Sequence, residues 1–345
     1  MRSTRVQSIR VRTLRILLLS NMYPTAERPE YGVFVARLEE ALRQRGHEID
    51  RAVLGPGKRG KLATPFTYLG LLRRAYGLSR RRRPDVVYAH FLVPTGLVAM
   101  ALRRPFVITA HGSDVANVGE IPLVGALTRR VVERAAGVIA VSQYLAERLP
   151  GTPREVEVID CGVDMTAFTP APRAPGDGPR FLFVGALNER KNIRRLLEAF
   201  GRLGEGTLTV AGAGPLAAEL RAEAPPGVTF IGRVPADGMP ALFAACDVYC
   251  QPSMVEAQGQ ALLEALATGR PVVATRVGGP PEYVNEACGV LVDPLDVDSI
   301  AEGMRRAAAL PVPNDAAVEV AKGHELNVQA ERVERLLARV SSSHG

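Results

Sequence analysis

Short apolar runs alternate with longer amphipathic segments along almost the whole chain. The runs at 14–20, 85–90 and 105–110 are nearly continuous, which is typical of strands buried on both faces of a parallel sheet. The amphipathic segments between such runs predict helices, for example from about Val33 to Gly46. The alternation therefore predicts an α/β fold with doubly wound parallel sheets, in which ligands bind beyond the carboxyl ends of the strands.

One stretch interrupts the alternation. The segment TPAPRAPGDGP at 169–179 is the richest in proline and glycine, which is typical of a linker. A chain of 345 residues also exceeds the size that one core usually serves. We therefore expect an N-terminal domain over 1–170 and a C-terminal domain over 171–314 that face each other across a cleft. A final helix, roughly 315–340, has no strand after it and could pack back onto the N-terminal domain.

The charge of the chain is biased toward arginine. The net charge of +7 comes from 43 basic residues, of which four are lysine. Arginines cluster at 73–74 and 80–83, which fits either a solvated surface or contact with an anionic membrane, and the sequence leaves both open. Aromatic residues make up 5% of the chain and tryptophan is absent, so we expect no nucleic-acid partner.

The apolar runs are too short for a membrane span, which needs roughly 18 residues. The arginine-rich start precedes a short apolar run without the cleavage pattern of a signal peptide. We expect a cytoplasmic protein, with peripheral contact at the inner face of the plasma membrane as an option. The four cysteines form no CxxC pair, which favours free thiols over a metal site; they are Cys161, Cys246, Cys250 and Cys288.

Two carboxylates, Glu256 and Glu264, are separated by seven residues in a small, apolar stretch. On one helix they would lie about 12 Å apart, beyond the roughly 5 to 9.5 Å of a glycosidase pair. Gly259 instead places Glu256 in a loop before a helix that contains Glu264. A diphosphate bound at that helix N-terminus would bring sugar hydroxyls to one acid and ribose hydroxyls to the other. A solvated helix face is the alternative.

The segment PSMVEAQGQALLEALATGRPVVAT resembles the E-x7-E segment of the retaining GT-B glycosyltransferases of family 4. The resemblance implies two Rossmann-like domains, with Glu256 at the donor sugar hydroxyls and Glu264 at the ribose. The family usually has Gly-Phe-Gly after the first glutamate, where this chain has Ala-Gln-Gly. The resemblance also places three further residues in the donor site, namely Gln258, Gly259 and Gln260.

The N-terminal half carries further similarity. SNMYPTAERPEYGVFVARLEEALRQRGHEI looks like the family's opening strand, loop and helix. There Gly32 would let the backbone approach the donor or the acceptor, with a plain helix-entry role as the alternative. TAHGSDV is similar to the family's HGxD loop, which places His111 at the donor sugar and Asp114 on the acceptor side. His90 also ends a predicted strand, and either caps a helix or contacts the acceptor.

The segment FVGALNERKN is similar to the first strand–helix loop of the family's donor domain and contains Gly185. Arg190 and Lys191 would neutralise the diphosphate and the charge on the leaving group. A cationic pair is unfavourable at a helix start, so a bound anion explains it better than an exposed surface does. The commoner family pattern has an arginine directly after the glycine, where this chain has Ala186.

A rival reading starts from AGAGPLA, which matches the G-x-G-x-x-A dinucleotide fingerprint. Arg233 after the next predicted strand would suit a 2′-phosphate, so an NADP-dependent oxidoreductase is an alternative. That alternative leaves the two glutamates and the basic pair unexplained. The resemblance instead places Gly212 and Gly214 near the nucleotide, with Arg233 and Val234 beside its base.

The resemblance implies transfer of a sugar from a UDP- or GDP-linked donor to an acceptor hydroxyl with retention of configuration. It implies no cofactor and no metal, and the sequence has no DxD-like pair. The opening segment is most similar to bacterial branches that build envelope polysaccharide or glycolipid, which suggests a lipid-linked or saccharide acceptor. A non-catalytic sugar-nucleotide-binding protein with the same fold is a further alternative.

Overall fold

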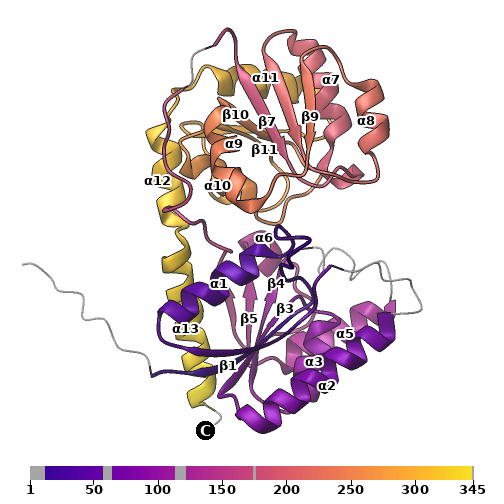
Figure 1. The fold of residues 1–345 in the computed structure, drawn as a ribbon, viewed down its shortest axis with the longest axis vertical. Coiled ribbons are helices and arrows are strands. Elements are labelled where there is room, and N and C mark those ends of the chain that lie inside the picture. Colours follow the sequence, from indigo (N-terminus) through magenta and orange to yellow (C-terminus); the bar gives the residue numbers. More distant parts are fainter. Residues whose placement is uncertain (1–11, 57–63, 113–121, 174–175, 344–345) are drawn as a thin grey trace, which may run out of the picture.

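The structure is a computed structural model that describes residues 12–56, 64–112, 122–173 and 176–343. These residues form two six-stranded sheets, each parallel throughout and covered on both faces by helices (Figure 1). The predicted fold class is confirmed. The predicted site residue Asp114 lies outside the described residues.

The first sheet has the strand order β2-β1-β3-β4-β5-β6. Its strands are β1 (Arg15–Ser20), β2 (Glu48–Val53), β3 (Val86–His90), β4 (Phe106–Ala110), β5 (Gly137–Ala140) and β6 (Val156–Val158). Its helices are α1 (Val33–Gln44), α2 (Thr64–Arg82), α3 (Thr95–Ala101), α5 (Pro122–Arg134) and α6 (Gln143–Ala146). Leu17 and Leu19 of β1 pack in one core cluster with α2, α3 and α5, and Ile16 and Leu18 pack in another with α1. Both faces of the strand are buried, which explains its continuous apolar run.

The second sheet has the strand order β12-β11-β10-β7-β8-β9. Its strands are β7 (Arg180–Val184), β8 (Thr207–Ala211), β9 (Val228–Gly232), β10 (Val248–Gln251), β11 (Val272–Thr275) and β12 (Gly289–Val292). Its helices are α7 (Ile193–Leu203), α8 (Ala217–Glu223), α9 (Met239–Ala245), α10 (Gln260–Ala267) and α11 (Val297–Ala308). Short 3-10 turns are η1 (Glu189–Lys191), η2 (Ala236–Gly238) and η3 (Pro280–Glu282). The linker 169–179 lies between the last strand of the first sheet and the first strand of the second.

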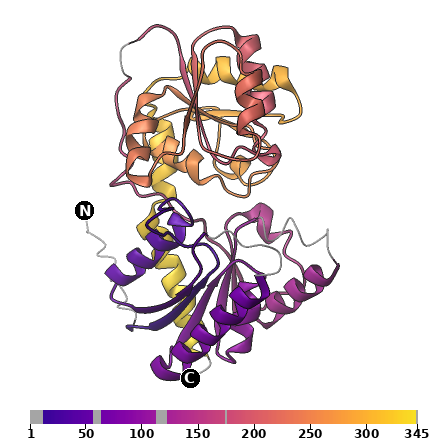
Figure 2. The ribbon, with the colours of Figure 1, turned by 45° about the vertical axis from the view of Figure 1, so that its right-hand side comes forward.

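The C-terminal segment forms two helices rather than the single one expected, and the second of them packs on the first domain. Helix α12 (Asp315–Gly323) packs on α10, and α13 (Leu326–Ser342) packs with α1 against the first sheet (Figures 1 and 2). The break lies beside Val163, whose N–H donates to His324 O at 2.8 Å and whose carbonyl accepts from Leu326 N at 2.9 Å. These bonds take the place of intrahelical bonds, so one helix ends and the next begins where the chain passes between the domains.

The carboxyl ends of the two sheets face each other, and contacts join the domains across the cleft. The Glu282 carboxylate accepts hydrogen bonds from the backbone N–H groups of Gln143 and Tyr144, at 2.9 and 2.8 Å. These are the first two residues of α6, so an acid from one domain caps a helix of the other. The four cysteines form no disulfide; Cys246, Cys250 and Cys288 are buried, and Cys161 is partly exposed. No described helix has the length and apolar character needed to cross a bilayer.

Candidate active site

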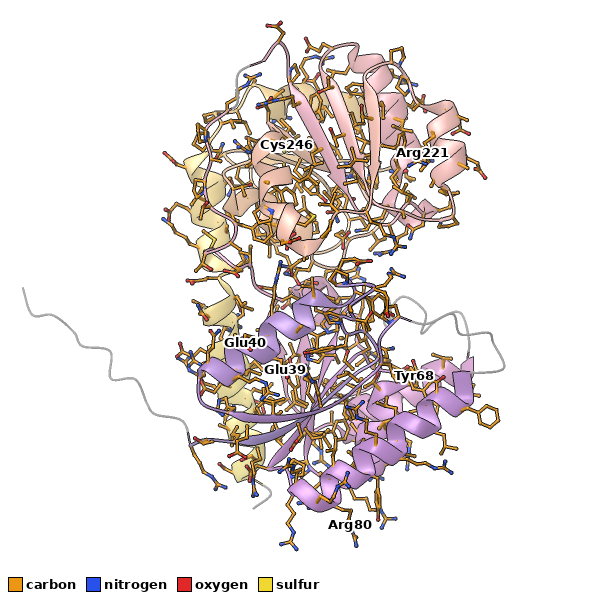
Figure 3. All side chains as sticks on the ribbon, viewed as in Figure 1. Glu39, Glu40, Tyr68, Arg80, Arg221 and Cys246 are labelled. Atoms are coloured by element: carbon orange, nitrogen blue, oxygen red, sulfur yellow. The ribbon has the colours of Figure 1, made fainter. Side chains whose placement is uncertain are left out.

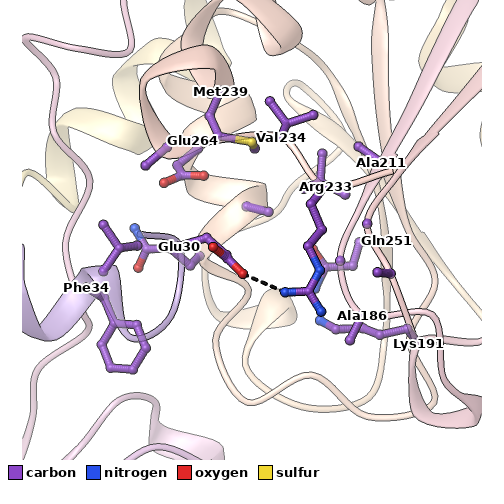
Figure 4. A pocket seen from close by; sticks show the side chains of 18 of the residues that line it. Glu30, Phe34, Ala186, Lys191, Ala211, Arg233, Val234, Met239, Gln251 and Glu264 are labelled. Atoms are coloured by element: carbon purple, nitrogen blue, oxygen red, sulfur yellow. Dashed lines mark hydrogen bonds and ion pairs between the residues drawn. The ribbon is translucent and has the colours of Figure 1, made fainter. Parts of the chain in front are cut away.

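A cavity of about 440 Å³ lies between the two domains. The first domain contributes the loop after β1 and the start of α1, and the second contributes the loops after β7, β8 and β9 together with α10 (Figure 4). Its lining carries four cationic and three acidic side chains, namely Arg28, Arg37, Lys191, Arg233, Glu30, Glu256 and Glu264. The site therefore sets charged side chains among apolar ones, and it lies where the fold predicted a ligand.

Lys191 and Glu256 form the most buried ion pair of this cavity. Lys191 Nζ lies 2.6 Å from Glu256 Oε2. Gln251 Nε2 donates to the same oxygen, and Ser253 Oγ donates to it at 3.2 Å. Burial alone would raise the pKa of Glu256, but the charge and hydrogen bond of Lys191, the charge of Arg190 and the Gln251 bond hold that pKa below its ordinary value. Glu256 is therefore ionised at neutral pH.

The loop after β7 sets the position of Lys191. Asn188 precedes the 3-10 turn η1, and its side-chain oxygen accepts a hydrogen bond from Lys191 N at 3.1 Å. Gly212, in the adjacent loop, has φ +142°, and a Cβ there would lie 1.8 Å from the carbonyl oxygen of Gly185. Gly214 is packed in the same way against the carbonyl of Leu187, at 2.2 Å. The two loops thus fit together only because these positions have no side chain.

Gly259 separates the two glutamates, as predicted. It is the N-cap of α10 with φ +88°, so Glu256 lies in the loop before the helix and Glu264 lies inside it. The side chains of Gln258 and Gln260 reach across the domain boundary. Gln258 Oε1 accepts from Cys161 N at 3.0 Å, and Gln260 Nε2 donates to Gly162 O at 2.7 Å.

Glu264 is paired with the first domain. Arg37 Nη1 of α1 donates to Glu264 Oε1 at 2.8 Å. Burial raises the pKa of Glu264, and the charge and hydrogen bond of Arg37 offset only part of that rise. Arg233 makes a second bridge across the cleft, because its Nη1 lies 2.9 Å from Glu30 Oε1 (Figure 4).

Two histidines meet beside the cavity. His90 at the end of β3 and His111 just after β4 are neighbours because of the strand register, and His90 Nδ1 lies 3.0 Å from His111 Nε2. The His111 ring packs against Phe34 and Phe91, with centroids 4.9 and 4.6 Å away. Burial lowers the pKa of His111 to about 3, and burial followed by the charge of His111 lowers the pKa of His90. Both rings are therefore neutral at physiological pH.

The predicted site residues divide into those that line the cavity and those that do not. The lining includes Gly185, Lys191, Gly212, Arg233, Val234, Glu256, Gln260 and Glu264. It does not include Gly32, His90, His111, Arg190, Gly214, Gln258 or Gly259. Among these, His111 contacts the lining residue Phe34. Arg190 is exposed and acts on Glu256 through its charge.

Gly32 has a local structural reason to be glycine. It stands before α1 with φ +72°, and a Cβ there would lie 2.6 Å from the backbone of Met22. The close approach that the sequence predicted is therefore an approach to the chain's own loop. This fits the alternative of a helix-entry glycine.

Several lining residues were not predicted from the sequence, notably Arg28, Glu30, Phe34, Arg37 and Gln251. Gln251 is the last residue of β10, and that position is the signal that was available. Its side chain links Tyr249, whose hydroxyl donates to Gln251 Oε1 at 2.7 Å, to Glu256. Arg37 has no such signal, because its partner lies 227 residues away.

Comparison with known proteins assigns the enzyme class. Residues 31–167 match the family described as Glycosyltransferase Family 4, and residues 178–309 match the family described as Glycosyl transferases group 1. The 2-deoxystreptamine glucosyltransferase of Streptomyces kanamyceticus is 30% identical over 274 residues, which are 68% of this chain and 71% of that protein. This chain belongs to glycosyltransferase family 4. It is therefore a glycosyltransferase, and the comparisons give no support to the oxidoreductase alternative.

A second relative aligns with more of this chain. WcaL of Escherichia coli, named as a colanic acid biosynthesis glycosyltransferase, is 30% identical over 310 residues, which are 82% of this chain and 72% of that protein. Solved structures share the fold. Sucrose-phosphate synthase from Thermosynechococcus elongatus has a TM-score of 0.83 at 20% identity, covering 96% of this chain and all of that one. Anabaena HepE in complex with UDP-glucose has a TM-score of 0.72 at 20% identity with the same coverage.

Proposed function

We propose that this family 4 enzyme transfers a sugar from a nucleoside diphosphate sugar, UDP- or GDP-linked, to an acceptor hydroxyl with retention of configuration. One observation carries the proposal. The Lys191–Glu256 pair lies in the interdomain cavity together with Glu264 of α10, so a cation, a helix N-terminus and two carboxylates converge on one space. The layout suits a ligand that has a diphosphate between two polyols.

In this proposal the diphosphate lies near Lys191 and the N-terminus of α10. The first backbone N–H groups of a helix have no intrahelical acceptor and attract anions. A bound diphosphate competes with Glu256 for Lys191, and Glu256 is then free to accept hydrogen bonds from the donor sugar hydroxyls. Arg190 adds positive charge from the rim. Gln251 keeps the carboxylate oriented throughout, because its own oxygen is held by Tyr249.

At the nucleoside end, Glu264 accepts from the ribose hydroxyls. The Glu264 carboxylate is buried and bonded to Arg37, so hydroxyl donors would stabilise it. Arg233, Val234 and the loop that begins at Gly212 border the space left for the base.

The reaction proceeds on one face of the sugar. The bond from the anomeric carbon to the leaving diphosphate oxygen breaks, and the acceptor oxygen forms its bond on the same side while its proton passes to the diphosphate. Lys191 and the α10 N-terminus stabilise the developing negative charge. The compensating positive charge is provided by the protein, so we propose that neither a metal nor a cofactor takes part. Neutral His111 brings no charge to the donor sugar, and it supports the sugar end of the cavity through its contact with Phe34.

The acceptor is proposed to be lipid-linked or a saccharide in bacterial envelope polysaccharide or glycolipid synthesis. The enzyme would then work in the cytoplasm, at the inner face of the plasma membrane. The similarity to WcaL over most of the chain supports the polysaccharide branch of this proposal.

Thermal unfolding with UDP- and GDP-sugars tests the donor, because a ligand that binds the folded state raises the melting temperature. Stabilisation and hydrolysis with a nucleotide sugar are expected, and both should survive EDTA. Glu256→Ala and Lys191→Ala should abolish turnover while circular dichroism shows a folded protein. Unchanged turnover in either variant contradicts the site. Binding without turnover under all conditions favours a non-catalytic protein, and stabilisation by NADPH alone favours a dehydrogenase.

A further inference from the structure

The solvent-exposed face of helix α2 carries large apolar side chains among arginines. Phe66, Leu69, Arg73, Tyr76 and Arg80 are spaced three and four residues apart, so they follow one line along the helix. Phe66 is 76% exposed, Tyr76 52% and Leu69 42%. The outer face of a surface helix is normally polar. Three large apolar residues in line on it form an exposed patch that calls for a partner.

The same face is cationic. Arg73, Arg74, Arg80 and Arg81 are all exposed, and none of them forms an ion pair with a described residue. Figure 3 shows Arg80 extending outward from the helix, and its guanidinium carbon lies 5.9 Å from the centre of the Tyr76 ring. The helix contains no acidic residue. Its positive charge is therefore available to an anionic partner.

Helix α5, which like α2 contacts α3, carries an exposed apolar residue of its own. Leu123, near its start, is 68% exposed. Helices α2 and α5 both contact α3. Each precedes a parallel strand of the first sheet, so each begins near the carboxyl edge of that sheet, which borders the cleft. Phe66 and Leu123 therefore lie toward the cleft, and the arginine-rich end of α2 lies away from it.

We propose that this surface binds the headgroup region of an anionic lipid bilayer. Phe66, Leu69 and Leu123 enter the boundary between headgroups and acyl chains, and the arginines contact lipid phosphates. An amphipathic helix that lies in a membrane interface combines these residue types. An acidic protein would satisfy the arginines but gives no reason for exposed phenylalanine and leucine. Such binding would bring the cleft to a lipid-linked acceptor, and that role rests on the proposed function. The binding of the surface to lipid does not depend on the proposed function.

Vesicle flotation with the full chain tests the surface. Binding is expected to phosphatidylcholine vesicles that contain phosphatidylglycerol, and not to phosphatidylcholine alone. Arg73→Ala with Arg80→Ala should weaken binding about 25-fold, because each arginine near an anionic surface contributes about fivefold. Phe66→Ser with Leu123→Ser should weaken it at least tenfold even at low salt, because apolar burial is lost.

A matched control removes the same two charges elsewhere. Arg305→Ala with Arg306→Ala, on α11 of the second domain, should leave vesicle binding within about twofold of wild type. The proposal is wrong if wild type does not float with anionic vesicles, or if the control weakens binding as much as the α2 variant. It is also wrong if poly-glutamate binds equally well and the serine variant retains full affinity, which would indicate an acidic protein partner.

Nucleotide-sugar hydrolysis measured on the same variants separates this surface from the proposed reaction. All of these substitutions lie outside the interdomain cavity, so hydrolysis should stay at the wild-type rate. If the protein binds vesicles but hydrolyses no nucleotide sugar, the membrane-binding proposal stands and the proposed donor is wrong. If it hydrolyses a nucleotide sugar but binds no vesicles, the proposed donor stands and the membrane-binding proposal is wrong.

Discussion

Replacing Lys191 by methionine tests how the charges of the cavity depend on one another. Lys191 Nζ lies 2.6 Å from Glu256 Oε2, and the two side chains are only 14% and 9% exposed. The substitution leaves a carboxylate that keeps its bonds from Gln251 and Ser253 but loses its contacting cation. Removing one partner of a buried pair typically costs about 3 to 5 kcal/mol. The two remaining hydrogen bonds place the expected loss near the lower end, at about 3 kcal/mol.

The loss should depend on pH. In the native protein the pKa of Glu256 is lowered, so its ionised form adds stability above the unfolded pKa, and that stability is lost as the pH falls through the folded pKa. Without Lys191, burial dominates and raises the pKa of Glu256 above the unfolded value. The variant then becomes less stable as the pH rises through the new pKa. The difference between variant and wild type should therefore be larger at about pH 7.5 than at about pH 4.5.

Urea unfolding followed by circular dichroism measures the free energy of unfolding at both pH values. The matched controls are Glu256→Gln and the double variant Lys191→Met, Glu256→Gln. The double variant has no unpaired charge, so it should recover at least half of the stability lost in Lys191→Met. If the double variant is as unstable as the single one, or if the loss is the same at both pH values, the ion pair does not have the role assigned to it.

Three further substitutions test separate parts of the site. Arg37→Ala should raise the pKa of Glu264 further, so the variant should lose stability relative to wild type as the pH rises from about 5 to about 8. Urea unfolding measures this, and a difference in the free energy of unfolding that does not change with pH contradicts it. His90→Phe should lower kcat for transfer about tenfold, because His111 loses its hydrogen-bond partner, whereas His90→Asn should keep most of the rate with an unchanged KM. If His90→Phe keeps more of the rate than His90→Asn, His90 has a packing role only. Gly212→Ala should destabilise the fold by about 2 kcal/mol, because its Cβ would overlap a backbone carbonyl, and a calorimetric melting temperature equal to wild type would rule out that close approach.

The order of strands and helices followed from sequence pattern because it depends on local rules. A strand buried on both faces has to be apolar throughout, and a helix has to be amphipathic, so the period of the pattern identifies each element. At Gly259 a local rule also located the start of a helix. This glycine begins a helix with a positive φ, and the sequence alone separated Glu256 from Glu264 on that basis.

The single C-terminal helix expected from the sequence was wrong for a non-local reason. Gly323 ends α12, but a single glycine also occurs inside helices, so this local signal did not fix the break. The break forms because Val163, 161 residues before His324, supplies the backbone bonds that end one helix and begin the next. A partner so distant in the chain leaves no trace in the local pattern.

Within the site, the sequence by itself determined which chemical groups are present: one carboxylate before a helix and one inside it, a lysine in the loop after a strand and a histidine at a strand end. The tertiary structure alone decided which of them touch. Arg37 and Glu264 meet because two domains face each other, and His90 and His111 meet because of the register of β3 and β4. Pairing, burial and the resulting pKa shifts depend on distances between segments far apart in the chain, and such distances exist only after folding.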